Sequence, residues 1–512
     1  MTSRPRVQPR EVWLLTATFL VAVAGLIYEL IAATLSSYLL GDSVRQFSFV
    51  IGIFLASMGL GAWVSRYVRD PLPGFVWAQI LLGIAGGFLA PVVFGLYAWT
   101  GEVAVPLYSL LIAVGILSGM EIPLIARTLH GIGAPEFRFE NVLSFDYLGA
   151  LAASLAFPVL IIPHLGLMSA SLAFGALNLA VAALSLWIFR RDLSLAPLAV
   201  WAVAAVATGL GLWQAERIVS LTEAQLYEDD VILSEDTAYQ HITVTRFRDR
   251  IRLFLDHSIQ FDSYDEYRYH EALVHPAMGL VPAPKRVLIL GGGDGMALRE
   301  VLRHPVEAVT LVDLDPRVTE IFSSHPDLAA LNGHSYDDPR LTAVNFDAWR
   351  FVEDTEEAYD VIILDLPDPK TLALSKLYSR EFYAMLVDRL AAGGAVVTQA
   401  GSPFYARQAF WSIVETWEAT RNPYAPGAGL NVIPYHALVP SFGDWGFVLA
   451  TVEDPAPRPL PLPEGLGFLT RGTWAAAQSF DGDTDRIAAR VNSIRDHALL
   501  GFYVGAWEKW FR

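Results

Sequence analysis

Residues 286–315 read RVLILGGGDGMALREVLRHPVEAVTLVDLD. The apolar run 287–290 enters four glycines that are interrupted only by Asp294, and a second apolar run ends in Asp313 and Asp315. This order predicts a strand, a glycine turn, a helix and a second strand that ends in an acid. Glycine lets the backbone approach a ligand closely, the helix N-terminus offers free N–H groups, and an acid about 20 residues on accepts both hydroxyls of a ribose. The stretch predicts an adenosine-type ligand on a doubly wound sheet; a tight turn with nothing bound is the alternative.

Composition divides the chain into two parts. Of 512 residues 54% are hydrophobic, and the mean hydropathy of +0.39 is too high for an ordinary soluble protein. Residues 1–214 hold ten arginines, no lysine and ten acids, so the whole net charge of −17 lies in the remainder. That acidity argues against a nucleic-acid partner and is compatible with a cationic substrate or with plain solubility. Because cysteine is absent, disulfides, thiolate metal sites and thiol catalysis are excluded.

The first part predicts a membrane bundle of about seven helices in a multi-pass protein of the cell inner membrane, in contact with the lipid bilayer. Each span needs about 20 apolar residues to cross a bilayer core of roughly 30 Å. The predicted spans lie near 12–34, 46–65, 74–98, 104–126, 142–163, 166–189 and 194–213. The first is interpreted as an anchor rather than a signal peptide, because a further span follows it without a small-residue cleavage site.

Arginines predict the orientation of this bundle. They cluster in alternate loops, at Arg4, Arg6 and Arg10, at Arg66 and Arg69, at Arg127 and Arg138, and at Arg190 and Arg191. This bias places the N-terminus in the cytoplasm, and seven spans then place the second part outside. The supply of an adenosine-type cosubstrate favours the cytoplasm instead. Three explanations remain open: one stretch does not span, the bias misleads, or the domain is external.

The second part predicts an α/β domain behind a small antiparallel sheet. Three β-rich runs, 231–233, 241–247 and 251–255, precede a helix that ends near Leu280. Later strands at 341–346, 360–364 and 394–399 and a helix at 382–390 predict a mostly parallel sheet, with its ligand at the carboxyl ends of the strands.

The expected domain boundaries follow from these elements. The bundle covers 1–215, the β-rich part 216–275, the doubly wound domain 276–455, and a proline-rich linker with a C-terminal amphipathic helix 456–512. That helix is predicted over 484–511, docked on its own domain in preference to the membrane surface.

Five acids fall at or just past predicted strand ends. They are Asp294, Asp313, Asp347, Asp365 and Asp368. One such acid is explained by chance, as a solvated carboxylate at a strand end. Five on the rim of one crevice form a constellation of the kind found at functional sites.

Several motifs together resemble one family. They are GGGDG followed by LRE, LDHSIQFDSYDEYRYHE at 255–271, YDDPRL at 336–341, YDVIILDLPDP at 359–369, and EFY at 381–383. Across about residues 225–450 the chain resembles the spermidine synthase family of polyamine aminopropyltransferases, and the preceding bundle resembles a membrane-attached branch of it. The resemblance implies a Rossmann-like sheet of the class I methyltransferase type. We also expect a homodimer or a higher homo-oligomer.

The resemblance implies how the donor, decarboxylated S-adenosylmethionine, is held. Asp313 matches the acid that holds the ribose hydroxyls, Asp347 matches the acid that meets the adenine amine, and Asp294 matches the aspartate that binds the aminopropyl amine. Further donor contacts are expected from Gln240, Gln260, Gly291, Gly293 and Gly295. The donor is a cosubstrate, and no cofactor or metal is expected.

The resemblance also implies an acceptor site for a diamine or polyamine. Asp365 matches the proposed base for the attacking amine, while Tyr269, His270 and Asp368 match residues that help to place the polyamine. A sulfonium carbon is already electrophilic, so the enzyme has to align the reactants and supply a neutral amine.

Three departures from the family concern this site. The ribose acid is Asp313 where glutamate is usual, and residues 370–376 (KTLALSK) replace a glycine-proline gate. Phe442 stands where a tyrosine would offer its hydroxyl to the polyamine, and Tyr435 or Asp444 is the expected substitute.

Three acids of the bundle, Glu29, Glu121 and Asp146, lie in or at the start of predicted spans. A carboxylate in hydrocarbon is costly and therefore faces a bundle interior or an aqueous path. Lining a cation or polyamine pathway and forming hydrogen bonds between spans are equally good interpretations.

Three functions are compared. The favoured one is aminopropyl transfer to a diamine, with putrescine converted to spermidine and methylthioadenosine released. The alternatives are a methyltransferase that uses undecarboxylated S-adenosylmethionine, and a polyamine transporter or sensor with a non-catalytic binding domain.

Overall fold

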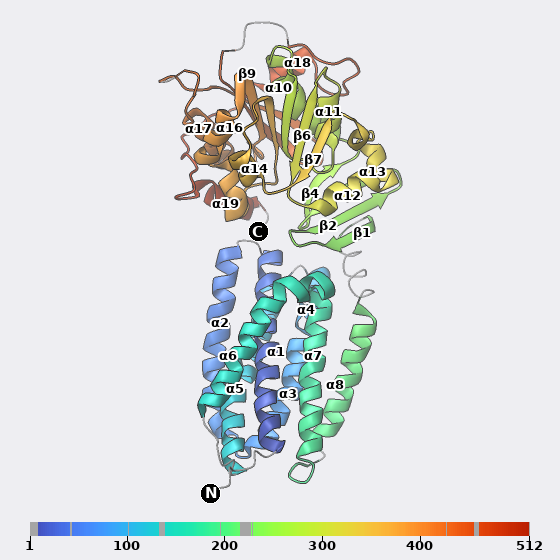
Figure 1. Cartoon of the computed structure of the whole chain (residues 1–512), viewed down its shortest axis with the longest axis vertical. Coiled ribbons are helices and arrows are strands. Elements are labelled where there is room, and N and C mark those ends of the chain that lie inside the picture. Colours follow the sequence, from blue (N-terminus) through green and yellow to red (C-terminus); the bar gives the residue numbers. More distant parts are fainter. Residues whose placement is uncertain are drawn as a thin grey trace. The chain divides into compact units, whose positions relative to one another are not determined.

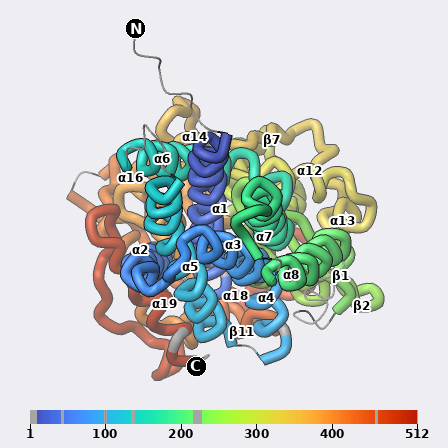
Figure 2. The backbone as a smooth tube through the Cα atoms, turned by 90° about the horizontal axis from the view of Figure 1, so that it is seen from below, coloured from blue at the N-terminus to red at the C-terminus, as the bar shows by residue number. Residues whose placement is uncertain are grey.

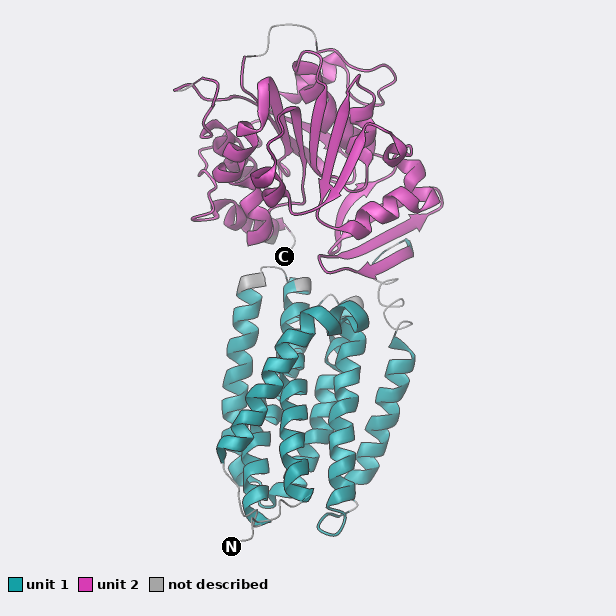
Figure 3. Cartoon of the chain, viewed as in Figure 1, with its two compact units in different colours: residues 1–231 teal, residues 232–512 magenta. Residues whose placement is uncertain are grey.

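The computed structural model describes residues 9–40, 43–100, 102–132, 139–194, 196–215, 227, 229–425, 427–454 and 460–510. The chain divides into two compact units, residues 1–231 and 232–512 (Figure 3). Some sequence-based predictions concern residues outside the described ranges, namely Arg4, Arg6, Arg138, Phe511 and the start of the proline-rich linker at 455–459.

The first unit is a bundle of long apolar helices. Its helices are α1 (Pro9–Leu40), α2 (Ser43–Val64), α3 (Pro71–Gly87), α4 (Leu89–Thr100), α5 (Ala104–Gly131), α6 (Phe139–Ala156), α7 (Ile162–Ile188) and α8 (Ala196–Trp213), with single turns at Ser65–Tyr67 and Phe157–Ile161. Figure 2 shows α1 near the middle of the bundle, and it packs against α2, α5, α6 and α7. A Cβ on Gly61 of α2 would lie 2.0 Å from the Ile116 carbonyl oxygen of α5, so glycine permits this close helix packing.

Among the described residues of this unit, six helical stretches are long and apolar enough to cross a membrane, one fewer than predicted. The difference arises at 142–163 and 166–189, which the structure joins in one 50-residue stretch, Phe139–Ile188. This stretch is not straight, because Gly166 has the non-helical angles φ 63 and ψ 175. Figure 1 shows the chain rising through α6, arching over and descending through α7, so that the start of α1 and the end of α8 lie at opposite ends of the bundle.

The second unit begins with the predicted small sheet. Its strands β1 (Asp230–Asp236), β2 (His241–Phe247), β3 (Arg250–Leu255) and β4 (Ser258–Asp262) are hydrogen-bonded in chain order. One face packs Ile242, Val244 and Leu253 against Phe322 and other apolar residues of the larger domain. The small sheet is therefore part of the same folded unit and packs on helical residues between Met296 and Leu328.

The larger sheet has seven strands in the order β10-β11-β9-β8-β5-β6-β7. In chain order they are β5 (Arg286–Gly291), β6 (Ala308–Asp313), β7 (Leu341–Asn345), β8 (Tyr359–Asp365), β9 (Leu390–Gln399), β10 (Asn431–Val439) and β11 (Gly443–Thr451). The neighbouring strands β9, β8, β5, β6 and β7 pair in parallel. Strand β11 pairs antiparallel with both β9 and β10. The predicted doubly wound, Rossmann-like sheet is confirmed.

Helices cover both faces of this sheet (Figure 1). They are α10 (Glu266–Leu280), α11 (Met296–Leu302), α12 (Pro316–Ser324), α13 (Pro326–Leu331), α14 (Ala348–Asp354), α15 (Leu372–Ser375), α16 (Arg380–Asp388), α17 (Arg407–Glu418), α18 (Arg471–Ala477) and α19 (Ala498–Trp510). Along β5, Val287 and Ile289 join the core on the α10 side, whereas Leu288 and Leu290 join the core on the α16 and α17 side. Because both faces are buried, the strand is an unbroken apolar run rather than an alternating one.

The C-terminal prediction needs a correction, because the helix predicted over 484–511 begins only at Ala498. Ahead of it, backbone groups bond to side chains of α17: the Trp411 indole donates to the Thr484 carbonyl oxygen, and the Ser412 hydroxyl donates to that of Arg490. These contacts replace the i to i−4 bonds of a helix. Helix α19 buries Leu499 and Tyr503 in the core of the unit, so docking on its own domain is confirmed.

Gly291, at the end of β5, offers a test of the close strand packing. It has φ +82, and a Cβ there would lie 2.1 Å from the Asp365 carbonyl oxygen. We expect Gly291→Ala to lower the melting temperature of the detergent-purified chain steeply, because the Asp365 carbonyl belongs to the paired strand β8 and cannot move away from the added methyl group. Gly393→Ala is the matched control: its φ of +71 is similar, its nearest atom lies 3.9 Å away, and only the backbone strain of about 1 kcal/mol applies. Equal losses in the two variants would contradict this packing argument.

Candidate active site

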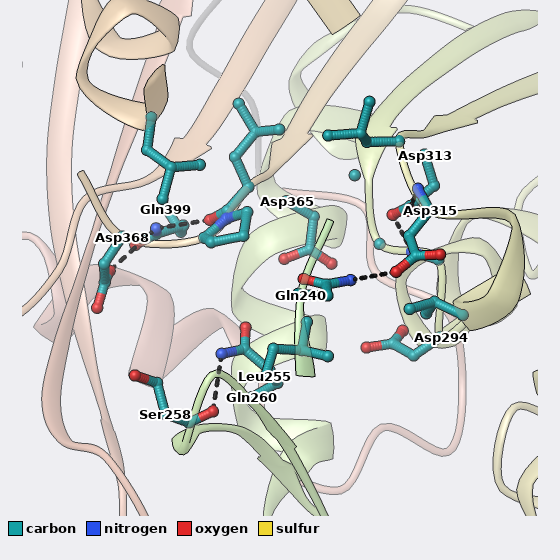
Figure 4. Close-up of a pocket in the computed structure, with 18 of the residues that line it drawn as sticks. Gln240, Leu255, Ser258, Gln260, Asp294, Asp313, Asp315, Asp365, Asp368 and Gln399 are labelled. Carbon is teal, nitrogen blue, oxygen red and sulfur yellow. Dashed lines mark hydrogen bonds between the residues drawn. The ribbon is translucent and has the colours of Figure 1, made fainter. Parts of the chain in front are cut away.

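A cavity of about 370 Å³ lies at the carboxyl ends of the central strands of the second unit (Figure 4). Its walls come from the glycine turn after β5, the ends of β6 and β8, helix α10, the turns of the small sheet and the 366–377 segment. Parallel strands place their carboxyl ends at one edge, which is why acids distant in sequence meet there. The cavity lies where the sequence predicted the ligand.

The glycine turn grips Asp313 at the end of β6. The Gly293 N–H donates to Asp313 Oδ2 at 3.0 Å, and the Asp315 N–H donates to Oδ1 at 2.9 Å. A Cβ on Gly293 would lie 2.7 Å from the Asp313 carboxyl carbon, so only glycine fits. Burial raises the pKa of Asp313 to about 6, although these two N–H groups act to lower it.

Asp315 connects the small sheet to the site. It is 1% exposed, caps α12, and accepts hydrogen bonds at Oδ2 from Thr237 Oγ1 at 2.7 Å and Gln240 Nε2 at 3.1 Å. Figure 4 shows Gln240 directed toward this carboxylate. Gln260, on β4, donates to the Ser258 carbonyl oxygen at 3.0 Å. The two predicted glutamines therefore lie on the small-sheet side of the pocket.

The centre of the pocket holds a carboxylate pair around one imidazole. His270, Asp294 and Asp365 each offer a nitrogen or oxygen atom, and these three atoms lie within 4.8 Å of one another. Asp365 Oδ1 accepts a hydrogen bond from the Tyr269 hydroxyl at 2.8 Å, and Asp294 Oδ1 accepts one from the Met296 N–H at 2.9 Å. The arrangement brings a candidate base and a candidate ammonium ligand into one small space.

His270 is held as a cation. Its Nδ1 lies 2.7 Å from Glu266 Oε2, and Arg299 donates to both oxygens of Glu266 at 3.0 Å. Burial by itself would lower the pKa of His270, but Glu266, Asp294 and Asp365 together raise it to about 9. The raised pKa favours the cationic form of the imidazole beside the two carboxylates.

The surroundings of the two central carboxylates, Asp294 and Asp365, destabilise their ionised forms. Burial raises the pKa of Asp294 to about 6, the charge of His270 acts to lower it, and the charge of Asp365 acts to raise it. The pKa of Asp365 is raised by burial as well, against the opposing effects of His270 and the Tyr269 hydroxyl. Carboxylates in this condition accept protons and bind cations readily.

Asp368 forms the far end of the pocket, on the loop after β8. Its Oδ1 accepts from Gln399 Nε2 at 3.2 Å and its Oδ2 accepts from the Tyr503 hydroxyl at 2.5 Å. Burial raises the pKa of Asp368, while Tyr503, Lys370 and Gln399 act to lower it. Lys370 itself donates to Ser258 Oγ at 2.6 Å across the pocket.

Most of the predicted site residues line this cavity. They are Gln240, Gln260, Tyr269, His270, Gly291, Gly293, Asp294, Asp313, Asp347, Asp365, Asp368 and Phe442. Asp347 caps α14 and lies 3.5 Å from Lys376 Nζ, and the Phe442 ring meets the Tyr269 ring edge-on at 5.9 Å.

Three residues named in the predictions lie outside the lining, namely Gly295, Tyr435 and Asp444. Gly295 starts α11 and packs against Ser335 and Tyr336. Tyr435 is 1% exposed in the core, where its hydroxyl donates to the Ala272 carbonyl oxygen at 2.8 Å. Asp444 is paired with His436 at 2.6 Å. Neither Tyr435 nor Asp444 replaces the hydroxyl that Phe442 lacks.

The three acids of the bundle belong to the other unit. Glu121 is 6% exposed and accepts a hydrogen bond at Oε1 from Gln79 Nε2 of α3 at 2.5 Å, which is the inter-helix interpretation of this residue. Glu29 lies on α1 and Asp146 on α6, both partly buried.

Sequence reasoning missed several residues of the pocket. Gln399, Lys370 and Trp445 line it, and Tyr503 reaches Asp368 from behind. Gln399 directly ends a predicted strand, so its position at a strand end was an available signal. Nothing in the sequence pattern connects Tyr503 to a loop that lies 135 residues earlier.

Comparison with known proteins gives consistent matches. Residues 266–456 match the model of the spermine/spermidine synthase domain. A polyamine aminopropyltransferase of Ralstonia nicotianae is 43% identical over 96% of this chain and 98% of its own, and one of Leptospira interrogans is 40% identical over the same shares. The crystal structure of spermidine synthase from Thermotoga maritima matches with a TM-score of 0.44 at 28% identity, covering 49% of this chain and 84% of that one.

Asp294 offers a test of how much a buried negative charge in the pocket destabilises the fold. Its pKa in the folded state, about 6, lies above the ordinary 3.8, so the ionised carboxylate destabilises the fold above pH 6 and this cost fades as the pH falls toward 4. We expect Asp294→Asn to raise the stability by about 2 kcal/mol at pH 7.5, seen as a higher melting temperature, with the gain shrinking between pH 6 and pH 4. Asp354→Asn, at the exposed end of α14, is the control and should change little. A pH-independent effect at Asp294 would contradict the prediction.

Proposed function

Because the chain belongs to the polyamine aminopropyltransferase family, we propose that this pocket transfers the aminopropyl group of decarboxylated S-adenosylmethionine to putrescine, releasing spermidine and methylthioadenosine. The aminopropyltransferase activity follows from relatives that are at least 40% identical along nearly their whole length. The choice of putrescine and the roles of individual residues are the proposal.

The charge of the pocket is the observation that carries the proposal. Its described lining includes seven aspartates, at positions 256, 294, 313, 315, 347, 365 and 368, against two basic side chains, His270 and Lys370. The proposed donor is a sulfonium with an ammonium group, and the acceptor is a diammonium at neutral pH. Several buried carboxylates are the surroundings that such cations require, since each cation must find a partner when it leaves water.

The donor is assigned to the glycine-turn side of the pocket. Asp313, already fixed by two backbone N–H groups, is available to the ribose hydroxyls, and Asp294 lies in the turn itself, where the aminopropyl ammonium would pass. Gln240, Gln260 and Asp347 are assigned to the nucleoside. The buried glycine turn supports this assignment, because its backbone permits an approach that any side chain would block.

The acceptor is assigned to the side of Asp365 and Asp368. One ammonium of the diamine gives its proton to Asp365, and the resulting neutral nitrogen attacks the aminopropyl carbon attached to sulfur. The new C–N bond forms as the C–S bond breaks, and the electron pair of that bond returns to sulfur, which leaves as a neutral thioether. The raised pKa of Asp365 supports its role as the base, since a carboxylate with an ordinary pKa accepts a proton less readily.

The helical unit supports a membrane-bound enzyme. Six stretches in the described ranges are long and apolar enough to cross a bilayer, which supports membrane association. The cell inner membrane is the location that we propose.

A product assay tests the proposal. Detergent-purified chain is incubated with decarboxylated donor and a panel of putrescine, cadaverine, 1,3-diaminopropane and spermidine, and methylthioadenosine is measured. We expect release with diamines and the highest kcat/KM with putrescine. Another best acceptor would overturn the choice of putrescine, and no release with any amine would overturn the function. Methyl transfer from undecarboxylated donor would instead support the methyltransferase.

Asp365→Asn separates chemistry from donor binding. Because the variant keeps the shape of the side chain but cannot accept a proton, we expect kcat to fall by about 10² to 10⁴ while the donor dissociation constant changes less than about threefold. Calorimetric donor titration measures the second quantity, and Asp354→Asn again serves as the control. A large loss of donor affinity with little loss of kcat would assign Asp365 to the donor instead of the base.

A further inference from the structure

The last helix of the chain reaches the acceptor end of the pocket. The Tyr503 hydroxyl of α19 donates to Asp368 Oδ2 at 2.5 Å, and Tyr503 is 8% exposed because its ring is packed in the core beside Leu499. The other carboxylate oxygen, Oδ1, is held by Gln399 at 3.2 Å. Asp368 is therefore fixed from two sides, and one side belongs to the C-terminal helix.

The residues just before α19 hold the neighbouring wall. Asn492 is fully buried, and its Nδ2 donates to the carbonyl oxygens of Ser375 at 2.9 Å and Tyr378 at 3.0 Å. Its Oδ1 accepts from the Leu499 N–H at 3.2 Å, at the start of α19. Thr371, Ala373, Leu374 and Leu377 line the pocket within that wall. One C-terminal segment, 492–503, thus supports both Asp368 and the 371–377 wall.

Among the described residues near this end, the Tyr269 hydroxyl is used by Asp365. Phe442 offers none, and Tyr435 spends its hydroxyl on the Ala272 carbonyl in the core. The Tyr378 hydroxyl donates to backbone carbonyl oxygens of the 366–367 loop and accepts from Gln399. In the described lining and its immediate surroundings, Tyr503 is the tyrosine whose hydroxyl bonds to Asp368.

We propose that α19 is part of the acceptor subsite, in which Tyr503 positions Asp368 to bind the ammonium group of the diamine that does not react. The proposal rests on the function proposed above. A hydrogen bond from the buried hydroxyl fixes Oδ2 and stabilises the ionised carboxylate, so that Oδ1 and the remaining lone pairs meet the ammonium without reorganisation. Tyr503 acts through Asp368 and is a positioning residue.

Tyr503→Phe tests the proposal, because it removes the hydroxyl and keeps the ring in the core. We expect KM for putrescine to rise about tenfold, a loss typical of a hydrogen bond to a charged group, while kcat at saturating amine and KM for the donor each change less than about twofold. Tyr424→Phe is the matched control: its hydroxyl donates to the Leu390 carbonyl oxygen at 2.6 Å, remote from Asp368, and its removal should leave all three constants unchanged.

A double-mutant cycle with Asp368→Asn separates positioning from general destabilisation. If Tyr503 acts through Asp368, adding Tyr503→Phe to Asp368→Asn changes KM for putrescine less than about twofold. A tenfold loss in both backgrounds, or an equal fall in kcat and donor affinity, would overturn the proposal by showing a structural effect only.

Direct binding keeps this test independent of turnover. Calorimetric titration of putrescine into each variant, saturated with methylthioadenosine, should show the same tenfold weakening for Tyr503→Phe. Absence of turnover in the wild-type chain would defeat the proposed function, yet putrescine binding that depends on Tyr503 would still support the subsite. Unchanged putrescine binding in Tyr503→Phe would overturn it.

Discussion

Holding several buried carboxylates in one pocket is the constraint on which the rest of the second unit depends. Asp294, Asp313, Asp365 and Asp368 all have a raised pKa because burial disfavours their charge. Each is nevertheless bonded to a donor: backbone N–H groups for Asp294 and Asp313, and tyrosine hydroxyls for Asp365 and Asp368. These neutral donors stabilise the carboxylates without cancelling their charge, which remains available to a cationic substrate.

At the centre of the pocket, His270 places a compensating positive charge close to the carboxylate pair of Asp294 and Asp365. The Glu266 carboxylate stabilises the cationic form of His270, and Arg299 donates hydrogen bonds to Glu266. An imidazolium between Asp294 and Asp365 limits their mutual repulsion while leaving a net negative charge. Buried ion pairs contribute little net stability, but these pairs of α10 and α11 hold a positive charge beside the two carboxylates.

The same constraint explains Gly293 and the residues that the small sheet and the last helix contribute to the site. Asp313 can be held by the turn after β5 only because Gly293 leaves room for its carboxylate. Gln240 reaches Asp315 from the small sheet, and Tyr503 reaches Asp368 from the last helix. Elements from three distant parts of the sequence therefore close one site.

Much of this was readable in the sequence, because it depends on local chemistry. The apolar runs ending in acids gave the parallel strands, the glycine turn gave the position of the pocket, and twelve of the predicted site residues line it. Long apolar stretches likewise gave the helical unit, although Gly166 bends two of them within one continuous stretch. What the tertiary structure alone decided is which distant groups meet. The periodicity of 484–497 is typical of a helix, but this segment bonds to α17 instead. Tyr435 lies in the core, and Tyr503 bonds to Asp368. Such long-range partners are chosen by packing across the sheet, and no local pattern in the chain records them.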